Sequence, residues 1–170
     1  HKFFVTVPAH FSNKSRSLFS SHCPNIHFLS PVLPKIPLIS RHLISPMHLL
    51  SKRVDVLFSP SGQLPLAWRK KSVITIHDVS IFSHPEWFPD QSTKAFSTGV
   101  FVPQSLKQAT KIIAVSEFTK SQIQALFPFA LNKIEVVHEG VEPPEHIPTI
   151  IKDKLSDWED MILCLGTIEP

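Results

Sequence analysis

The chain has 170 residues, of which 42% are hydrophobic and 18% charged, a balance that excludes an intrinsically disordered protein. Its net charge of +3, from 17 Lys and Arg against 14 Asp and Glu, is too small to indicate a nucleic-acid-binding surface. Two cysteines cannot form a disulfide framework, and no apolar stretch approaches the roughly 20 residues of a membrane span. Cys164 lies in an apolar run, which favours a reducing compartment.

Short runs of apolar and β-branched residues, each closed by polar residues or glycine, recur along the chain and predict β-strands. Most of these runs are continuous rather than alternating, which is typical of strands buried on both faces of a parallel sheet. The predicted strands are residues 3–7, 55–58, 72–76, 111–115, 133–137 and 161–165.

Helical patterns fall between the strands. The first helix is expected to begin near Ser45, with Pro46 in its first turn. The second, over residues 93–110, is interrupted at Gly99 and Pro103, and the third, over residues 117–127, follows Ser116 as its N-cap. The alternation of strands and helices predicts an α/β domain with a mostly parallel sheet.

The two ends of the chain suggest a piece of a longer protein, truncated at both ends. The chain begins without Met and stops just after the strand pattern of residues 161–165. A Pro-rich stretch at 141–148 is typical of a linker. We therefore expect one domain over residues 1–148, and over residues 149–170 a linker helix followed by the first strand of a second domain.

Ligands of open parallel α/β sheets bind beyond the carboxyl ends of the strands, so the residues that close the predicted strands are candidates for a site. Phosphate-loop and dinucleotide-binding glycine motifs are both missing from the sequence, which argues against kinase, ATPase and classical dinucleotide functions. The closing residues are Ser59, His77 with Asp78, Ser116 with Glu117, Glu139 with Gly140, and Gly166 with Thr167.

His77 and Asp78 form the most informative pair. A histidine at a strand end can act as a general base or bind a sugar hydroxyl, but it can equally bond a neighbouring backbone group while the aspartate caps a turn. A metal site with His84 matches no standard zinc spacing, so we expect no metal. Ser116 lies at a strand-to-helix junction, where it can favour an anion or serve only as the N-cap.

Five segments occur in the same order as in a known enzyme family. The chain resembles the N-terminal, acceptor-side domain of retaining glycosyltransferases with the GT-B fold, group 1 (family 4). Together the segments make a strong match from Asp55 to Pro170, and the first 50 residues match only weakly. The segments are residues 72–80, 84–89, 105–119, 133–141 and 162–170.

The resemblance implies two Rossmann-like domains facing each other across a cleft. It implies transfer of a sugar, with retention, from a nucleotide-diphosphate donor such as GDP-mannose or a UDP-sugar to the hydroxyl of a glycan or lipid-linked acceptor. Neither a metal nor a cofactor is implied. In biological terms, the resemblance points to a mannosyltransferase-like enzyme of polysaccharide biosynthesis.

The resemblance also assigns roles to residues of this chain. The family's Gly-rich loop is absent here, and its donor-binding Arg, Lys and paired Glu would follow Pro170. We therefore expect residues 1–170 alone to be inactive. The implied roles are catalysis for His77, acceptor binding for Asp78, Ser116 and Glu117, and donor binding for Gly140, Gly166 and Thr167.

Two further points stay open at this stage. A non-catalytic, flavodoxin-like α/β binding module is the alternative function. The expected location is the cytoplasm, with contact at the inner face of the membrane, although core packing explains the same phenylalanines equally well. The residues expected to contact the membrane are Phe3, Phe4, Phe11 and Phe19, together with the basic residues Lys2, Lys14 and Arg16.

Overall fold

A computed structural model of the chain describes residues 2–6, 17, 22–29, 37–88 and 95–141. The linker, helix and strand predicted after residue 141 lie outside the described residues, as do Gly166 and Thr167. The boundary predicted at residue 148 lies there too, so the two-domain division stays a prediction.

The described strands form two parallel sheets. In the larger sheet the strand order is β3-β4-β5-β6, and Phe58 pairs with Val73, Ile76 with Ala114, and Ala114 with Val136. Because all four strands run the same way, their carboxyl ends share one edge. The larger sheet comprises β3 (Val56–Ser59), β4 (Lys71–Ile76), β5 (Lys111–Ala114) and β6 (Ile134–Val136), and the smaller comprises β1 (Phe3–Thr6) and β2 (Ile26–Leu29).

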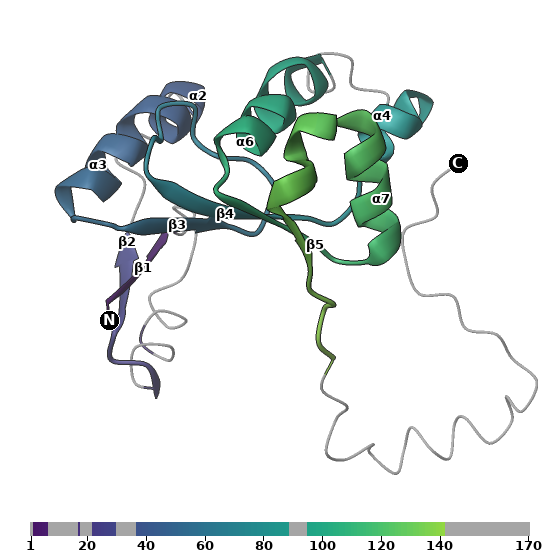
Figure 1. Cartoon of the computed structure of the whole chain (residues 1–170). Coiled ribbons are helices and arrows are strands. Elements are labelled where there is room, and N and C mark those ends of the chain that lie inside the picture. Colours follow the sequence, from purple (N-terminus) through teal and green to yellow (C-terminus); the bar gives the residue numbers. More distant parts are fainter. Residues whose placement is uncertain (1, 7–16, 18–21, 30–36, 89–94, 142–170) are drawn as a thin grey trace, which may run out of the picture.

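Helices connect the strands of the larger sheet, and α3, α6 and α7 lie on the same side of it (Figure 1). Parallel strands joined by covering helices confirm the Rossmann-like α/β class expected from the sequence. The helical segments are α2 (Pro37–Ile39), η1 (Ser40–Ile44), α3 (Ser45–Ser51), α4 (Ser80–Ser83), η2 (Pro85–Trp87), η3 (Ser97–Phe101), α6 (Val102–Gln108), α7 (Glu117–Leu126) and η4 (Pro128–Lys133).

The hydrophobic core lies between the sheet and these helices. Ile74 of β4 and Ile112 of β5 are fully buried, as are Leu106 of α6 and Ile123 of α7. Alternate residues of the strands point to the other face, and there the edge strand β3 leaves Phe58 56% exposed. The expectation of strands buried on both faces is therefore wrong for β3.

Two π-helical segments correct the predicted helix boundaries. The helix expected to begin near Ser45 continues a helical segment that starts at Pro37. In η1 the Ser45 N–H bonds the Ser40 carbonyl, five residues back, and Pro46 follows. Segment η3 precedes Pro103 in the same way. A wider turn gives the proline ring room, so the helical path continues through the proline here.

Candidate functional site

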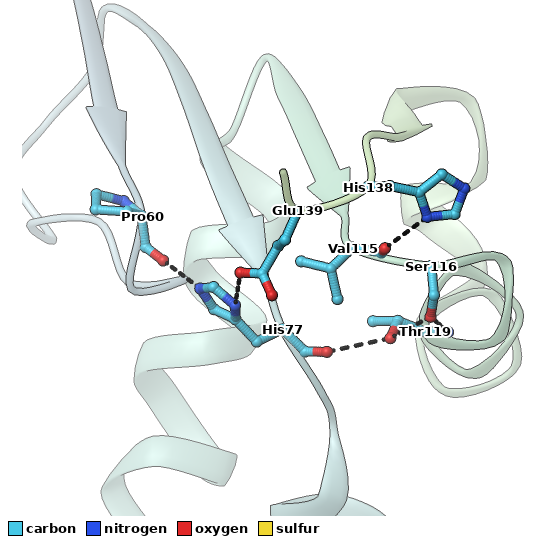
Figure 2. Close-up of polar contacts among 7 residues, drawn as sticks. All are labelled: Pro60, His77, Val115, Ser116, Thr119, His138 and Glu139. Atoms are coloured by element: carbon cyan, nitrogen blue, oxygen red, sulfur yellow. Dashed lines mark hydrogen bonds and ion pairs between the residues drawn. The ribbon is translucent and has the colours of Figure 1, made fainter. Parts of the chain in front are cut away.

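Four segments that follow strands meet at the carboxyl edge of the larger sheet (Figure 2). They carry Pro60 after β3, His77 after β4, Ser116 after β5 and Glu139 after β6. The sequence predicted that strand-closing residues would gather at one edge, and the structure confirms this for the strands it describes.

His77 lies at the centre of this edge. Its Nε2 is 2.9 Å from the carbonyl oxygen of Pro60, and its Nδ1 is 3.0 Å from Oε1 of Glu139. The side chain is 52% exposed, so solvent or a ligand can still reach the ring. The imidazole is thus held on two sides while remaining open at the surface (Figure 2).

A tight turn after β3 places the Pro60 carbonyl. Gly62 has a φ of +73°, a conformation that side-chain-bearing residues rarely adopt. A Cβ on Gly62 would lie 3.0 Å from Cδ1 of Ile76 and 3.2 Å from the carbonyl oxygen of Thr75. The Ser59 hydroxyl closes the turn by donating to the Gln63 carbonyl at 2.8 Å.

The segment after β6 crosses the end of β5 to reach His77. The Val137 N–H donates to the Ala114 carbonyl at 3.0 Å, and the next side chain, His138, donates through Nδ1 to the Val115 carbonyl at 3.2 Å. Glu139 follows and contacts His77, which comes directly after β4 and not after the neighbouring β5. These bonds, to the last residue of β5 and to the residue after it, therefore set the position from which Glu139 reaches the imidazole.

Ser116 is the N-cap of α7, as one of its two sequence interpretations predicted. Its hydroxyl accepts from the Thr119 N–H at 3.0 Å and also lies 3.0 Å from the Thr119 hydroxyl. Thr119 in turn donates to the backbone carbonyl of His77 at 3.1 Å. The start of α7 is thereby fastened to the end of β4, next to the imidazole.

The two predicted acceptor carboxylates have local partners. Asp78 accepts from the N–H of Ser80 at 2.8 Å and from the Ser80 hydroxyl, and so it caps the turn that begins α4. The Glu117 side chain is 76% exposed, and its Oε2 lies 3.8 Å from Nζ of Lys120. Both carboxylates follow strand ends at this edge, and a role in acceptor binding stays a prediction for each.

The predicted donor-binding and metal features are less informative. Gly140 is exposed, and no atom lies within 4 Å of a Cβ placed on it, so close packing does not explain the glycine. Over the ranges that the structure describes, no cluster of three His, Cys, Asp or Glu side chains is placed to hold a metal ion.

Two side chains with shifted pKa values lie away from the site. Burial lowers the pKa of His42 below its usual 6.5, and the charge of Arg41 lowers it further. A hydrogen bond from Lys111 lowers the pKa of Glu135, and the charge of the lysine adds to the effect. Glu135 projects from β6, and its Oε1 is 2.8 Å from Nζ of Lys111.

Sequence reasoning did not assign roles to three groups that shape this edge. Glu139 was identified as a strand-closing residue, but its contact with His77 depends on the strand order. Thr119 occupies the third position of α7, where a hydroxyl beside an N-cap is common and carries little signal. The Pro60 carbonyl is a backbone group, and only the neighbouring glycine hints at the turn that presents it.

Comparison with known proteins decides the family. The model of Glycosyltransferase Family 4 matches residues 3–144. The chain belongs to this family. Over 176 aligned residues it is 27% identical to O-antigen chain mannosyltransferase B of Escherichia coli, covering 98% of the chain and 45% of that relative. The chain therefore spans about half the length of this relative.

A solved structure is also similar to this family 4 chain. It is described as a crystal structure of a glycosyltransferase from Rickettsia africae ESF-5, and it is 16% identical with a TM-score of 0.45. The similarity covers 94% of the chain and 50% of that structure. Among the described residues, no helix combines the length and apolar character needed to cross a membrane.

Proposed function

We propose that the protein is a retaining, metal-independent glycosyltransferase. It takes a sugar from a nucleotide-diphosphate donor and transfers it to a hydroxyl of a glycan or lipid-linked acceptor. Mannose is the favoured sugar, because the Escherichia coli relative is named a mannosyltransferase. The observation that carries the proposal is the family match over residues 3–144, a range that contains the whole of the edge built around His77.

His77 is proposed to act on the donor sugar. Its ring is exposed at the carboxyl edge of a parallel sheet, where substrates of such folds bind. Breaking the bond to the leaving phosphate produces an oxocarbenium-like sugar, and a fixed hydrogen-bond donor beside that sugar stabilises the transition state. The leaving phosphate oxygen takes the acceptor proton, so the mechanism needs no strong protein base.

The residues around His77 divide between the two substrates in this proposal. Asp78, Ser116 and Glu117 line the acceptor side, because they follow the ends of the two central strands. Gly140 lies beyond β6 and belongs to the donor side, together with Gly166 and Thr167. The proposed substrates require no cofactor.

The proposed location is the cytoplasmic face of a membrane. The relative acts on O-antigen chains according to its name. Leu43, Met47 and Leu50 are exposed along one side of η1 and α3, and exposed Lys52 and Arg53 follow them. Apolar side chains beside basic ones suit an anionic lipid surface. If the protein stays at the bottom of a flotation gradient with anionic vesicles, this contact is excluded.

The test of the function uses the longest natural polypeptide that contains residues 1–170. It is incubated with labelled GDP-mannose or UDP-sugars and a glycolipid extract, with and without a metal chelator. We expect label to enter the glycolipid equally in both arms, with the anomeric configuration of the donor retained. Loss of transfer with the chelator contradicts metal independence. No transfer from any donor contradicts the function and favours the binding module.

A further inference from the structure

Glu139 contacts His77 through an unusual route. β5 separates β4 from β6, so the ends of the latter two strands are not neighbours in the sheet. Glu139 nevertheless brings Oε1 to 3.0 Å from Nδ1 of His77 (Figure 2). The bonds of Val137 to Ala114, the last residue of β5, and of His138 to Val115 carry the chain across. The geometry builds this contact from three successive residues.

Both partners of the imidazole are acceptors. The carbonyl oxygen of Pro60 faces Nε2, and a carboxylate oxygen of Glu139 faces Nδ1. Neither oxygen carries a hydrogen to donate, so each ring nitrogen must supply its own N–H. A neutral imidazole has one N–H only. A neutral ring therefore donates to only one of the two oxygens at a time.

Stability does not explain this pair. Both side chains are more than half exposed, and ion pairs in such positions contribute little to folding because water screens them. The Lys111–Glu135 pair is the local comparison, since Glu135 lies on β6, just before the segment that carries Glu139, and its side chain is 64% exposed against 65% for Glu139. What distinguishes Glu139 is its position at the edge where substrate is expected.

We propose that Glu139 is a positioning residue for His77. Its carboxylate contacts Nδ1 and fixes the orientation of the imidazole ring, so that the Nε2 edge, which now faces the Pro60 carbonyl, is available to an oxygen of the donor substrate. This inference rests on the proposed function for its catalytic meaning.

Other groups near the ring do not replace the carboxylate. The hydroxyl of Thr119 binds the backbone carbonyl of His77, not its ring. Asp78 accepts from Ser80, and His138 donates to the Val115 carbonyl. Removing the carboxylate of Glu139 should therefore release the ring at Nδ1 directly.

The first test is spectroscopic and needs no activity. In the longest natural polypeptide, nitrogen-15 spectra of labelled histidine report the hydrogen bonding of each ring nitrogen, and His77→Asn identifies the signals. We expect the Nδ1 signal of His77 to move in Glu139→Gln and to keep its wild-type position in Glu135→Gln, the matched control. An Nδ1 signal that is the same in the wild type and in Glu139→Gln overturns the inference.

The second test is kinetic. Glu139→Gln should lower kcat for sugar transfer roughly tenfold or more, while KM for the donor changes by less than about threefold. Glu135→Gln should match the wild type. An unaltered kcat in Glu139→Gln overturns the positioning role even if the ring signals change. If the wild type itself transfers no sugar, the proposed function fails, while the spectra still decide whether Glu139 controls the ring.

Discussion

The imidazole of His42 stacks on the phenyl ring of Phe101, with ring centroids 4.5 Å apart and planes 7° apart. The two residues belong to η1 and η3, so the stack joins both π-helical segments. Nδ1 of His42 accepts from the Leu66 N–H at 3.4 Å, and the side chain is buried. The neutral ring is therefore the form that fits the fold.

We expect this histidine to make the protein less stable in mild acid. Burial lowers the pKa of His42 in the folded chain, whereas in the unfolded chain it returns to its usual 6.5. The folded state thus binds fewer protons, and its full stability is present above pH 6.5 and is lost as pH falls through the lowered pKa.

Urea unfolding from about pH 8 to about pH 5 measures the effect. In His42→Asn the amide oxygen of the new side chain can still accept from the Leu66 N–H, but the side chain does not titrate. The variant should be less stable by about 1 kcal/mol near neutral pH, because the stacking is lost, and should lose less stability on acidification. His27→Asn, at an exposed position of β2, is the control. Equal acid sensitivity of wild type and His42→Asn contradicts the assignment.

The strands and the boundaries of α7 were largely predictable, and the path of the helices around Pro46 and Pro103 was not. β4 and β5 were correctly predicted because their apolar runs end at clear polar residues. β2 was missed, because residues 26–29 contain His27 and give only a short pattern. The helix start before Pro46 was misplaced because proline is typical of the first turn of a helix, whereas here a π-helical turn leads into it.

At the site, sequence reasoning found the edge but not its contacts. A parallel sheet brings strand ends together whatever their order, so His77, Ser116 and Glu139 were predictable as a group. Their pairing depends on the strand order and on the path of residues 137–139. The role of Ser116 as the N-cap follows from its position alone, whereas its link to His77 through Thr119 requires the fold.

The turn that presents Pro60 should depend on Gly62. Gly62→Ala places a Cβ against Ile76 and the Thr75 carbonyl at a positive φ, and should destabilise the fold by roughly 1–2 kcal/mol. Gly99→Ala is the matched control. It lies in η3 with no atom within 4 Å of the added Cβ, so it should be neutral or stabilising by up to about 1 kcal/mol.

Thermal or urea unfolding of the two alanine variants compares them directly. Equal stability of Gly62→Ala and Gly99→Ala would show that the turn tolerates a side chain. It would also remove the structural reason for the placement of the Pro60 carbonyl.

Ser116 allows its structural and binding roles to be separated. Ser116→Ala removes the cap of α7 and should cost about 1 kcal/mol of stability. Ser116→Asp keeps a capping oxygen and adds a favourable charge at the helix N-terminus, so it should fold as well as the wild type. If the hydroxyl also binds the acceptor, Ser116→Asp raises KM for the acceptor. An unchanged KM limits Ser116 to the cap.

The most direct test of the central claim is sugar transfer by His77→Asn in the longest natural polypeptide that contains this chain. The side chain is half exposed, so the variant should unfold at the wild-type temperature while kcat falls by about a hundredfold or more. His27→Asn should transfer sugar normally. A folded His77→Asn protein that retains wild-type transfer would contradict the account of this edge as the catalytic site.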